Sequence, residues 1–287
     1  MTQQINRIIV QLDATSETAT AIDTAARLAA RWRVPLHGVF IEDEELIGLA
    51  RLPFARQVTL GAGLEPLTRD HVEDHFRAFA ERARRDLAMA AERYDINWSF
   101  ETVRGPPGPD RLAGEHDFVV AGAESRPIGN HFRVASRCWS WTAIVARPFL
   151  LAKREWETGG SVLALLRRRD PRSARTLDIA AEIAGFGTGI LTVAQAFDLG
   201  GLDDFTAWVS ACLEGHSLSF QTEAATTEPA ALRQRIIDLD CRLLVLEADE
   251  RTAEPDELRG LVDQLTCDVL IIRNPASPAT QAPANQL

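Results

Sequence analysis

The chain has 287 residues, of which 46% are hydrophobic and 25% are charged. This length suits about two domains, and this composition excludes a chain that is disordered throughout. Asp and Glu outnumber Lys and Arg by 41 to 31, which gives a formal net charge of −10. A surface of that sign repels nucleic acid and anionic membranes, so we expect neither as a partner.

The lysine and cysteine content further limits the kinds of binding site that the chain could form. Lys153 is the only lysine, so a phosphate site built on lysine is excluded. The cysteines Cys138, Cys212, Cys241 and Cys267 lie far apart without a C-x-x-C pair, and they predict neither a disulfide framework nor a zinc site. The N-terminus lacks a secretory pattern, and no stretch is apolar for long enough to span a bilayer. We therefore expect a cytoplasmic protein.

Taken in chain order, the first half alternates short apolar runs with helical patterns. The runs that predict strands are residues 8–10, 34–40, 98–102, 118–121 and 143–147, and the helical patterns cover 22–29 and 76–87. Strands that alternate with helices pair in parallel through right-handed crossovers. The order therefore predicts an open α/β sheet with helices on both faces, and residues 42–70 form an insertion.

The second half repeats this order. Four positions of the first helix, Ile22, Ala25, Ala26 and Ala29, recur 155 residues later (177 − 22) as Leu177, Ala180, Ala181 and Ala184, with the i, i+3, i+4, i+7 spacing of one helix face. Asp23 and Asp178 match at the same offset. The second half has a helical pattern at 205–213, and its predicted strands are residues 163–165, 190–194, 218–222, 243–246 and 269–273. The sequence thus predicts two repeated open parallel-sheet domains, at residues 1–153 and 160–276, followed by a disordered tail at 277–287.

Candidate ligand sites follow from the ends of these strands. In open parallel sheets, ligands bind beyond the carboxyl ends of the strands, where the strand order reverses. Asp13 and Gly122 stand at two such ends in the first half. Arg167, Arg168 and Arg169 follow the first strand of the second half, and their guanidiniums could bind phosphate or carboxylate through forked hydrogen bonds. The alternative is a solvated, charged turn at the start of a helix.

A pair of histidines is the strongest metal-site candidate. His71 and His75 are four residues apart on a predicted helix, so both imidazoles could face one ion. The H-E-x-x-H motif of zinc proteases has Glu directly after the first histidine, but Val72 stands there. Two ligands alone rarely make a site, and we expect no metal.

The repeated order, the start VQLDAT and the strand ends before Arg147 and Arg273 resemble the universal stress protein family in its tandem two-domain form. The resemblance covers nearly the whole chain. It implies Rossmann-like domains of the adenine nucleotide alpha hydrolase type that pack as a pseudo-dimer. It also implies that the last strands, at 143–147 and 269–273, pair between the domains, and that the protein acts in a stress response.

ATP-binding members of this family carry the loop G-x-x-G, nine residues, and then G-S or G-T, whose backbone N–H groups surround the phosphates. The positions that match here are Gly122, Ser125, Ala135 and Ser136, so two of the three glycines are replaced. A Cβ atom hinders the approach of a phosphate to the main chain. The resemblance therefore implies a degenerate, vestigial nucleotide site.

The family resemblance also places Asp13 against the adenosine and Val39 in the base pocket. The alternative is that Asp13 caps the following helix and that Val39 is an ordinary core residue. In the second half, the matching stretch has no glycine before Gly260 and carries many carboxylates. We expect the second site to be lost.

These observations predict a non-catalytic stress-response or regulatory protein that binds a small ligand or a protein partner and needs no cofactor. One alternative is an ATP-binding protein or slow ATPase that uses only the first half, through Asp13, Val39, Gly122 and Ser136. A second alternative is a sensor of an anionic metabolite that binds at Arg167 to Arg169. We expect either a monomeric pseudo-dimer or a homodimer.

Overall fold

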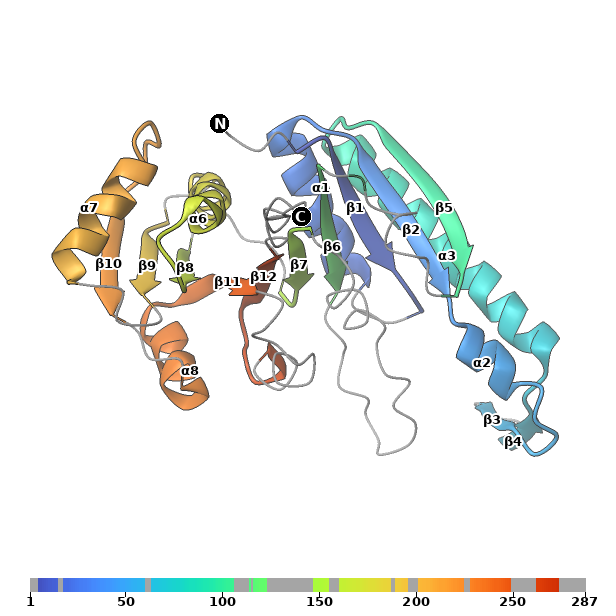
Figure 1. Cartoon of the computed structure of the whole chain (residues 1–287). Coiled ribbons are helices and arrows are strands. Elements are labelled where there is room, and N and C mark those ends of the chain that lie inside the picture. The colour runs from blue at the N-terminus through green and yellow to red at the C-terminus, as the bar shows by residue number, and fades with distance from the viewer. Residues whose placement is uncertain are drawn as a thin grey trace, which may run out of the picture. The chain divides into compact units, whose positions relative to one another are not determined.

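The computed structural model describes residues 5–14, 18–59, 63–105, 114, 116–122, 147–154, 160–186, 189–195, 201–224, 228–248 and 262–273. These residues belong to two compact α/β units (Figure 1). The N-terminal unit contains the elements from β1 to β6 together with residues 150–152 of β7, and the C-terminal unit contains the elements from β8 to β12. No helix among the described residues has the length and apolar character that crossing a membrane requires.

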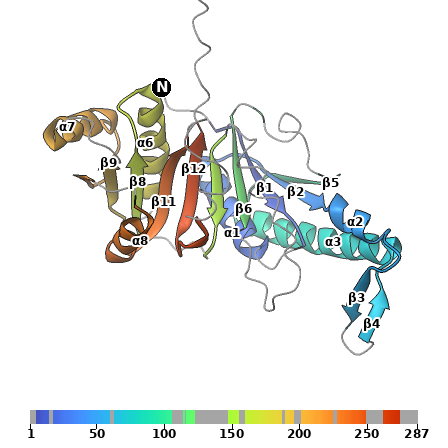
Figure 2. The same cartoon turned by 60° about the horizontal axis from the view of Figure 1, so that its bottom comes forward.

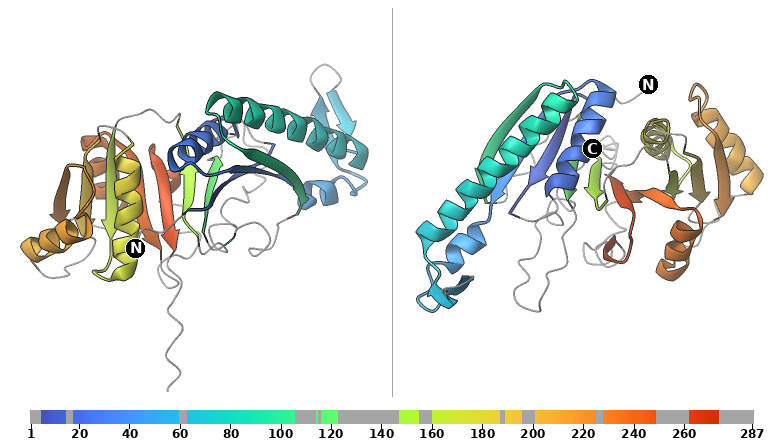
Figure 3. Two further views of the ribbon diagram at one scale, coloured as in Figure 1. Left: turned by 90° about the horizontal axis from the view of Figure 1, so that it is seen from above. Right: turned by 180° about the vertical axis from the view of Figure 1, so that it is seen from behind.

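The N-terminal unit is a sheet with two helices along one face. Its elements are β1 (Arg7–Leu12), α1 (Thr18–Trp32), β2 (Leu36–Glu42), α2 (Glu44–Leu49), β3 (Arg56–Thr59), β4 (Gly63–Pro66), α3 (Arg69–Arg93), β5 (Trp98–Arg104), β6 (Asp117–Gly122) and β7 (Phe149–Ala152). The main sheet has the order β7-β6-β1-β2-β5, and β1 pairs in parallel with both β2 and β6. Helices α1 and α3 lie side by side on this sheet (Figure 3).

The central strands of this sheet are apolar because both of their faces are covered. Residues 8–12 of β1 and 117–121 of β6 are all buried, as expected for interior strands of a parallel sheet. Helix α1 buries an alanine-rich face, and α3 buries residues spaced three or four apart, from Val72 to Ala91. Small side chains on α1 let that helix approach β1 and β6 closely.

The predicted insertion at residues 42–70 contains helix α2 and an antiparallel hairpin of β3 and β4. Asp43 caps α2, because its carboxylate accepts hydrogen bonds from the N–H groups of Glu45 and Leu46. The hairpin extends beyond the end of α3 (Figure 2). The insertion thus begins at the carboxyl end of β2, the strand that pairs in parallel with β1.

The C-terminal unit has the same architecture. Its elements are β8 (Ser161–Leu166), α6 (Pro171–Ala184), β9 (Leu191–Gln195), α7 (Leu202–Cys212), β10 (Phe220–Ala224), α8 (Pro229–Asp238), β11 (Cys241–Ala248) and β12 (Asp268–Arg273). Its strand order is β10-β9-β8-β11-β12, and every neighbouring pair in it is parallel. Helices α6 and α8 lie on opposite faces of this sheet (Figure 1).

The two units confirm the predicted α/β repeat. The spatial order of the strands is the same in both units when the main-sheet strands of each unit are numbered along the chain. It is 3-2-1-4-5 for β5-β2-β1-β6-β7 and again for β10-β9-β8-β11-β12. The buried faces of α1 and α6 also match at the predicted offset of 155, from Ala21 and Thr176 to Ala29 and Ala184. Two sheets with the same strand order and matching first helices thus come from two halves of one chain.

Two predicted strand positions differ from the described structure, one of them at its last residue only. The last strand of the N-terminal unit is Phe149–Ala152, whereas Arg147 from the predicted run lies in a bend and residues 143–146 lie outside the described residues. Both runs are apolar and separated only by Pro148, so periodicity could not distinguish them. Strand β10 begins at Phe220 rather than at residue 218, so its offset from β5 is 122 (220 − 98). The tail at 277–287 lies outside the described residues.

Candidate functional site

The candidate nucleotide site of the N-terminal unit lies where β1 and β6 end. Val10 and Gln11 of β1 are in register with Val120 and Ala121 of β6. Asp13 follows β1 directly, and Gly122 is the last residue of β6. These two predicted residues therefore lie at the same edge of the sheet, on its two central strands. The Thr18 hydroxyl, at the start of α1, donates a hydrogen bond of 3.2 Å to the Asp13 carbonyl oxygen.

Of the other residues predicted for this site, only Val39 lies among the residues that the structure describes. Val39 lies in β2, in register with Gln11, and its side chain is fully buried. It is a core residue of the sheet in this structure, and its role in a base pocket stays a prediction. Ser125, Ala135 and Ser136 lie outside the described residues. The prediction of a degenerate phosphate loop stays a prediction as well.

The matching edge of the C-terminal unit lies between β8 and β11. Ile8 is in register with Phe118 in the first unit, and Val162 is in register with Leu243 in the second. The strand offsets are therefore 154 (162 − 8) and 125 (243 − 118). These offsets place Arg167 where the first unit has Asp13, and Glu247 where it has Gly122.

Glu247 makes a contact that no glycine could make. Its Oε2 atom accepts a hydrogen bond of 3.0 Å from the backbone N–H of Arg167. Burial raises the pKa of the Glu247 carboxyl group, the negative charge of Asp170 adds to this effect, and the Arg167 N–H opposes it. The Ser173 and Thr176 side chains also lower this pKa, although Oε1 is buried without a well-formed hydrogen bond.

The arginines predicted as an anion site have different environments. The Arg169 Nη2 atom donates to the Gly201 carbonyl oxygen at 3.2 Å, and the guanidinium lies over the Phe205 ring, 5.4 Å from its centre. Arg169 thus holds the start of α7 through hydrogen bonding and a cation–π contact. Arg168 is exposed. The three residues lie at the end of β8 as the sequence predicts, but binding of an anion there stays a prediction.

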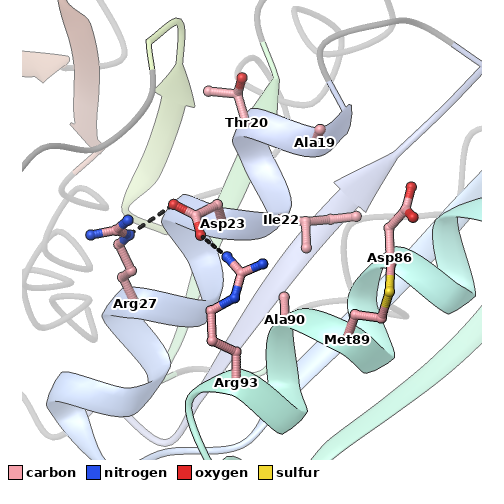
Figure 4. A pocket seen from close by; sticks show the side chains of 9 residues that line it. All are labelled: Ala19, Thr20, Ile22, Asp23, Arg27, Asp86, Met89, Ala90 and Arg93. Carbon is pink, nitrogen blue, oxygen red and sulfur yellow. Dashed lines mark hydrogen bonds and ion pairs between the residues drawn. The ribbon is translucent and has the colours of Figure 1, made fainter.

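A separate groove of about 350 Å³ lies between α1 and α3 (Figure 4). Three of its charged side chains, Asp23, Arg27 and Arg93, form one cluster. The Asp23 carboxylate accepts hydrogen bonds from Arg27 Nε at 2.7 Å, Arg93 Nη1 at 3.5 Å and the Tyr94 hydroxyl at 3.2 Å. In the C-terminal unit the matching Asp178 contacts His216 Nε2 at 3.4 Å. In each unit the repeated aspartate thus contacts residues at or just after the C-terminal end of the neighbouring helix.

Comparison with known proteins identifies the fold. No protein-family model and no curated protein matches the sequence. Among solved structures, a universal stress protein from Archaeoglobus fulgidus aligns with a TM-score of 0.70 and 11% identity, covering 96% of this chain and 98% of that one. This is the universal stress protein fold. A Pseudomonas aeruginosa protein of unknown function also aligns, with a TM-score of 0.60 and 16% identity over 94% of this chain and 93% of that one. A third structure, from Pseudomonas aeruginosa under a provisional universal stress protein name, has a TM-score of 0.60, 17% identity and 94% coverage of both chains.

The universal stress protein fold confirms the predicted Rossmann-like fold class. Within it the structure brings together Asp13 and Gly122, and it places Arg167 beside Glu247. Sequence reasoning missed Glu247, although a signal was present. The alignment of residues 118–121 with 243–246 places Gly122 opposite Glu247 when it is extended by one residue.

His71 and His75 lie on α3 of this universal stress protein fold. Among the residues that the structure describes, no group of three or more His, Cys, Asp or Glu side chains could hold a metal ion. Two imidazoles without a further ligand are a weak basis for a metal site.

Proposed function

We propose that this chain is a cytoplasmic, non-catalytic universal stress protein of the tandem form, which binds a small ligand or a protein partner and binds ATP poorly. One observation carries this proposal: the carboxylate of Glu247 stands in the C-terminal unit where Gly122 ends β6 in the N-terminal unit. A carboxylate at that edge repels a phosphate. The exchange of two loop glycines for Ser125 and Ala135 weakens the remaining site in the N-terminal unit.

The second candidate function is ATP binding, with or without slow hydrolysis, by the N-terminal unit alone. The position of Asp13 and Gly122 at one edge of the central strands favours it. Ligands of open α/β sheets bind at this kind of edge. The two candidates differ in the affinity that they predict for Mg-ATP.

Isothermal titration calorimetry with Mg-ATP separates them. The proposed function predicts a dissociation constant no tighter than about 1 mM for the wild type. Asp74→Ala is a matched control, because Asp74 is an exposed aspartate on α3 that pairs with Arg77 at 2.7 Å. A micromolar affinity that is lost in Asp13→Ala and kept in Asp74→Ala would establish the ATP-binding alternative instead.

A further inference from the structure

The C-terminal unit has its own ligand edge at the ends of β8 and β11. From β8 the chain passes through α6 to β9 on one side, and it returns to the other side of β8 as β11. The strand order therefore reverses between β8 and β11. Crevices at such reversals are the general ligand position of open parallel sheets. In the N-terminal unit the same reversal lies between β1 and β6.

A protein side chain already supplies negative charge to this edge. Oε2 of Glu247 accepts the backbone N–H of Arg167, and α6 begins directly after the same turn. Backbone N–H groups and the positive end of a helix are the groups that hold bound phosphates and carboxylates in other proteins. The Asp170 carboxylate accepts hydrogen bonds from two backbone N–H groups in the first turn of α6, those of Arg172 and Ser173, at 3.0 and 2.9 Å. Two side-chain carboxylates thus take the donors that an anionic ligand would need.

We propose that Glu247 is a built-in anion of the C-terminal unit, whose carboxylate occupies the position of a bound phosphate or carboxylate and so excludes anionic ligands from the β8–β11 edge. The inference deepens the proposed function, because it names the residue that closes the second site. It also gives the three arginines of this turn two partners of opposite charge, Asp170 and Glu247.

The proposal predicts that removing Glu247 opens an anion site. Without its carboxylate, the Arg167 N–H loses its acceptor, and the guanidiniums of the turn are opposed by Asp170 alone. The probe is inorganic phosphate, titrated by calorimetry into the full chain and into its Glu247→Ala variant, which share an unchanged N-terminal edge. Glu247→Ala should bind phosphate at least about tenfold more tightly than its parent. Adding Arg168→Ala should reverse part of this gain.

Two further variants keep the test decisive. Glu214→Gln removes a charge from an exposed position of the same unit and should leave phosphate binding unchanged. Glu247→Gln keeps the size of the side chain, and it should show a gain in the same direction if Glu247→Ala fails to fold. Unchanged phosphate affinity in a folded Glu247 variant would overturn the inference. Tight phosphate binding by the parent chain that Arg168→Ala weakens would overturn it too. Neither result depends on the Mg-ATP experiment, which concerns the N-terminal unit.

Discussion

The side chain of Glu247 lies where burial disfavours its charged form, and this has a consequence for stability. Burial raises the pKa of its carboxyl group in the folded state, so the folded protein holds this proton to a higher pH than the unfolded chain does. The contribution to stability is complete below the ordinary glutamate pKa, and it is lost as the pH rises through the raised value. The wild type therefore loses stability across this mildly acidic range because of Glu247.

Glu247→Gln should remove this dependence. In urea unfolding at a series of pH values, the stability of the variant relative to the wild type should increase as the pH rises from below the ordinary glutamate pKa through the raised one. Glu214→Gln serves as the control and should show a constant difference. A pH-independent difference for Glu247→Gln would mean that its carboxyl group titrates normally in the folded protein.

A second observation at the residue scale concerns the matching aspartates of the first helix in each unit, α1 and α6. Asp23 of α1 and Asp178 of α6 match in the sequence. Asp23 accepts a hydrogen bond from the Tyr94 hydroxyl, and Asp178 contacts His216 Nε2. Their partners differ, since Tyr94 and Arg93 serve in the first unit and His216 in the second. The repeat therefore keeps a contact from the first helix to the C-terminal end of the next helix or the turn after it, while the donor changes.

At the scale of elements, the packing of α3 on the sheet depends on a glycine in β2. A Cβ atom at Gly38 would lie 2.6 Å from Leu87 Cδ2 and 3.0 Å from Phe100 Cδ2. Leu87 is fully buried, so it can move only by displacing α3. Gly38→Ala should therefore lower the free energy of unfolding by about 1 to 2 kcal/mol, measured by urea denaturation.

Gly48→Ala in α2 is the matched control, because nothing lies within 4 Å of the Cβ position at Gly48. The helix propensity of alanine should make this variant equal to the wild type or more stable by about 0.5 to 1 kcal/mol. Equal effects of the two substitutions would show that the contact with Leu87 does not limit the approach of α3.

The elements also show what the sequence could and could not predict. The faces of α1 and α6 follow a 3.6-residue period, and the buried strands are short apolar runs, so both repeats were predictable. Strand β7 was misplaced because two apolar runs flank Pro148, and neither has a period. Helix α8 was not predicted, since only Leu232 and Ile236 of its apolar residues are buried while Ile237 is exposed.

The candidate site was predictable only in part, for a different reason. The positions of Asp13 and Gly122 follow from strand ends, which apolar runs define. The contact between Glu247 and the Arg167 N–H depends on the register of β8 against β11 and on the rotamer of one side chain. A sequence pattern specifies neither, so the carboxylates of this stretch could be counted but not placed.

At the scale of the whole molecule, the two units share a fold but differ in charge at the equivalent edge. The first unit has Asp13 and Gly122 there, and the second has Arg167 and Glu247. A tandem chain with one closed edge differs from a dimer of identical subunits, in which every site occurs twice. Only one half of this chain is then left to bind a phosphate-bearing ligand.

This asymmetry predicts the stoichiometry of binding even where the affinity is weak. Native mass spectrometry at millimolar Mg-ATP should show the 31.6 kDa chain with at most one bound nucleotide, because the carboxylate of Glu247 excludes a second. Asp13→Ala should lower the occupancy of that single state, and Asp74→Ala should not. A saturable second nucleotide on the wild-type chain would show that the β8–β11 edge is open, and it would refute both the asymmetry of the two units and the closing role of Glu247.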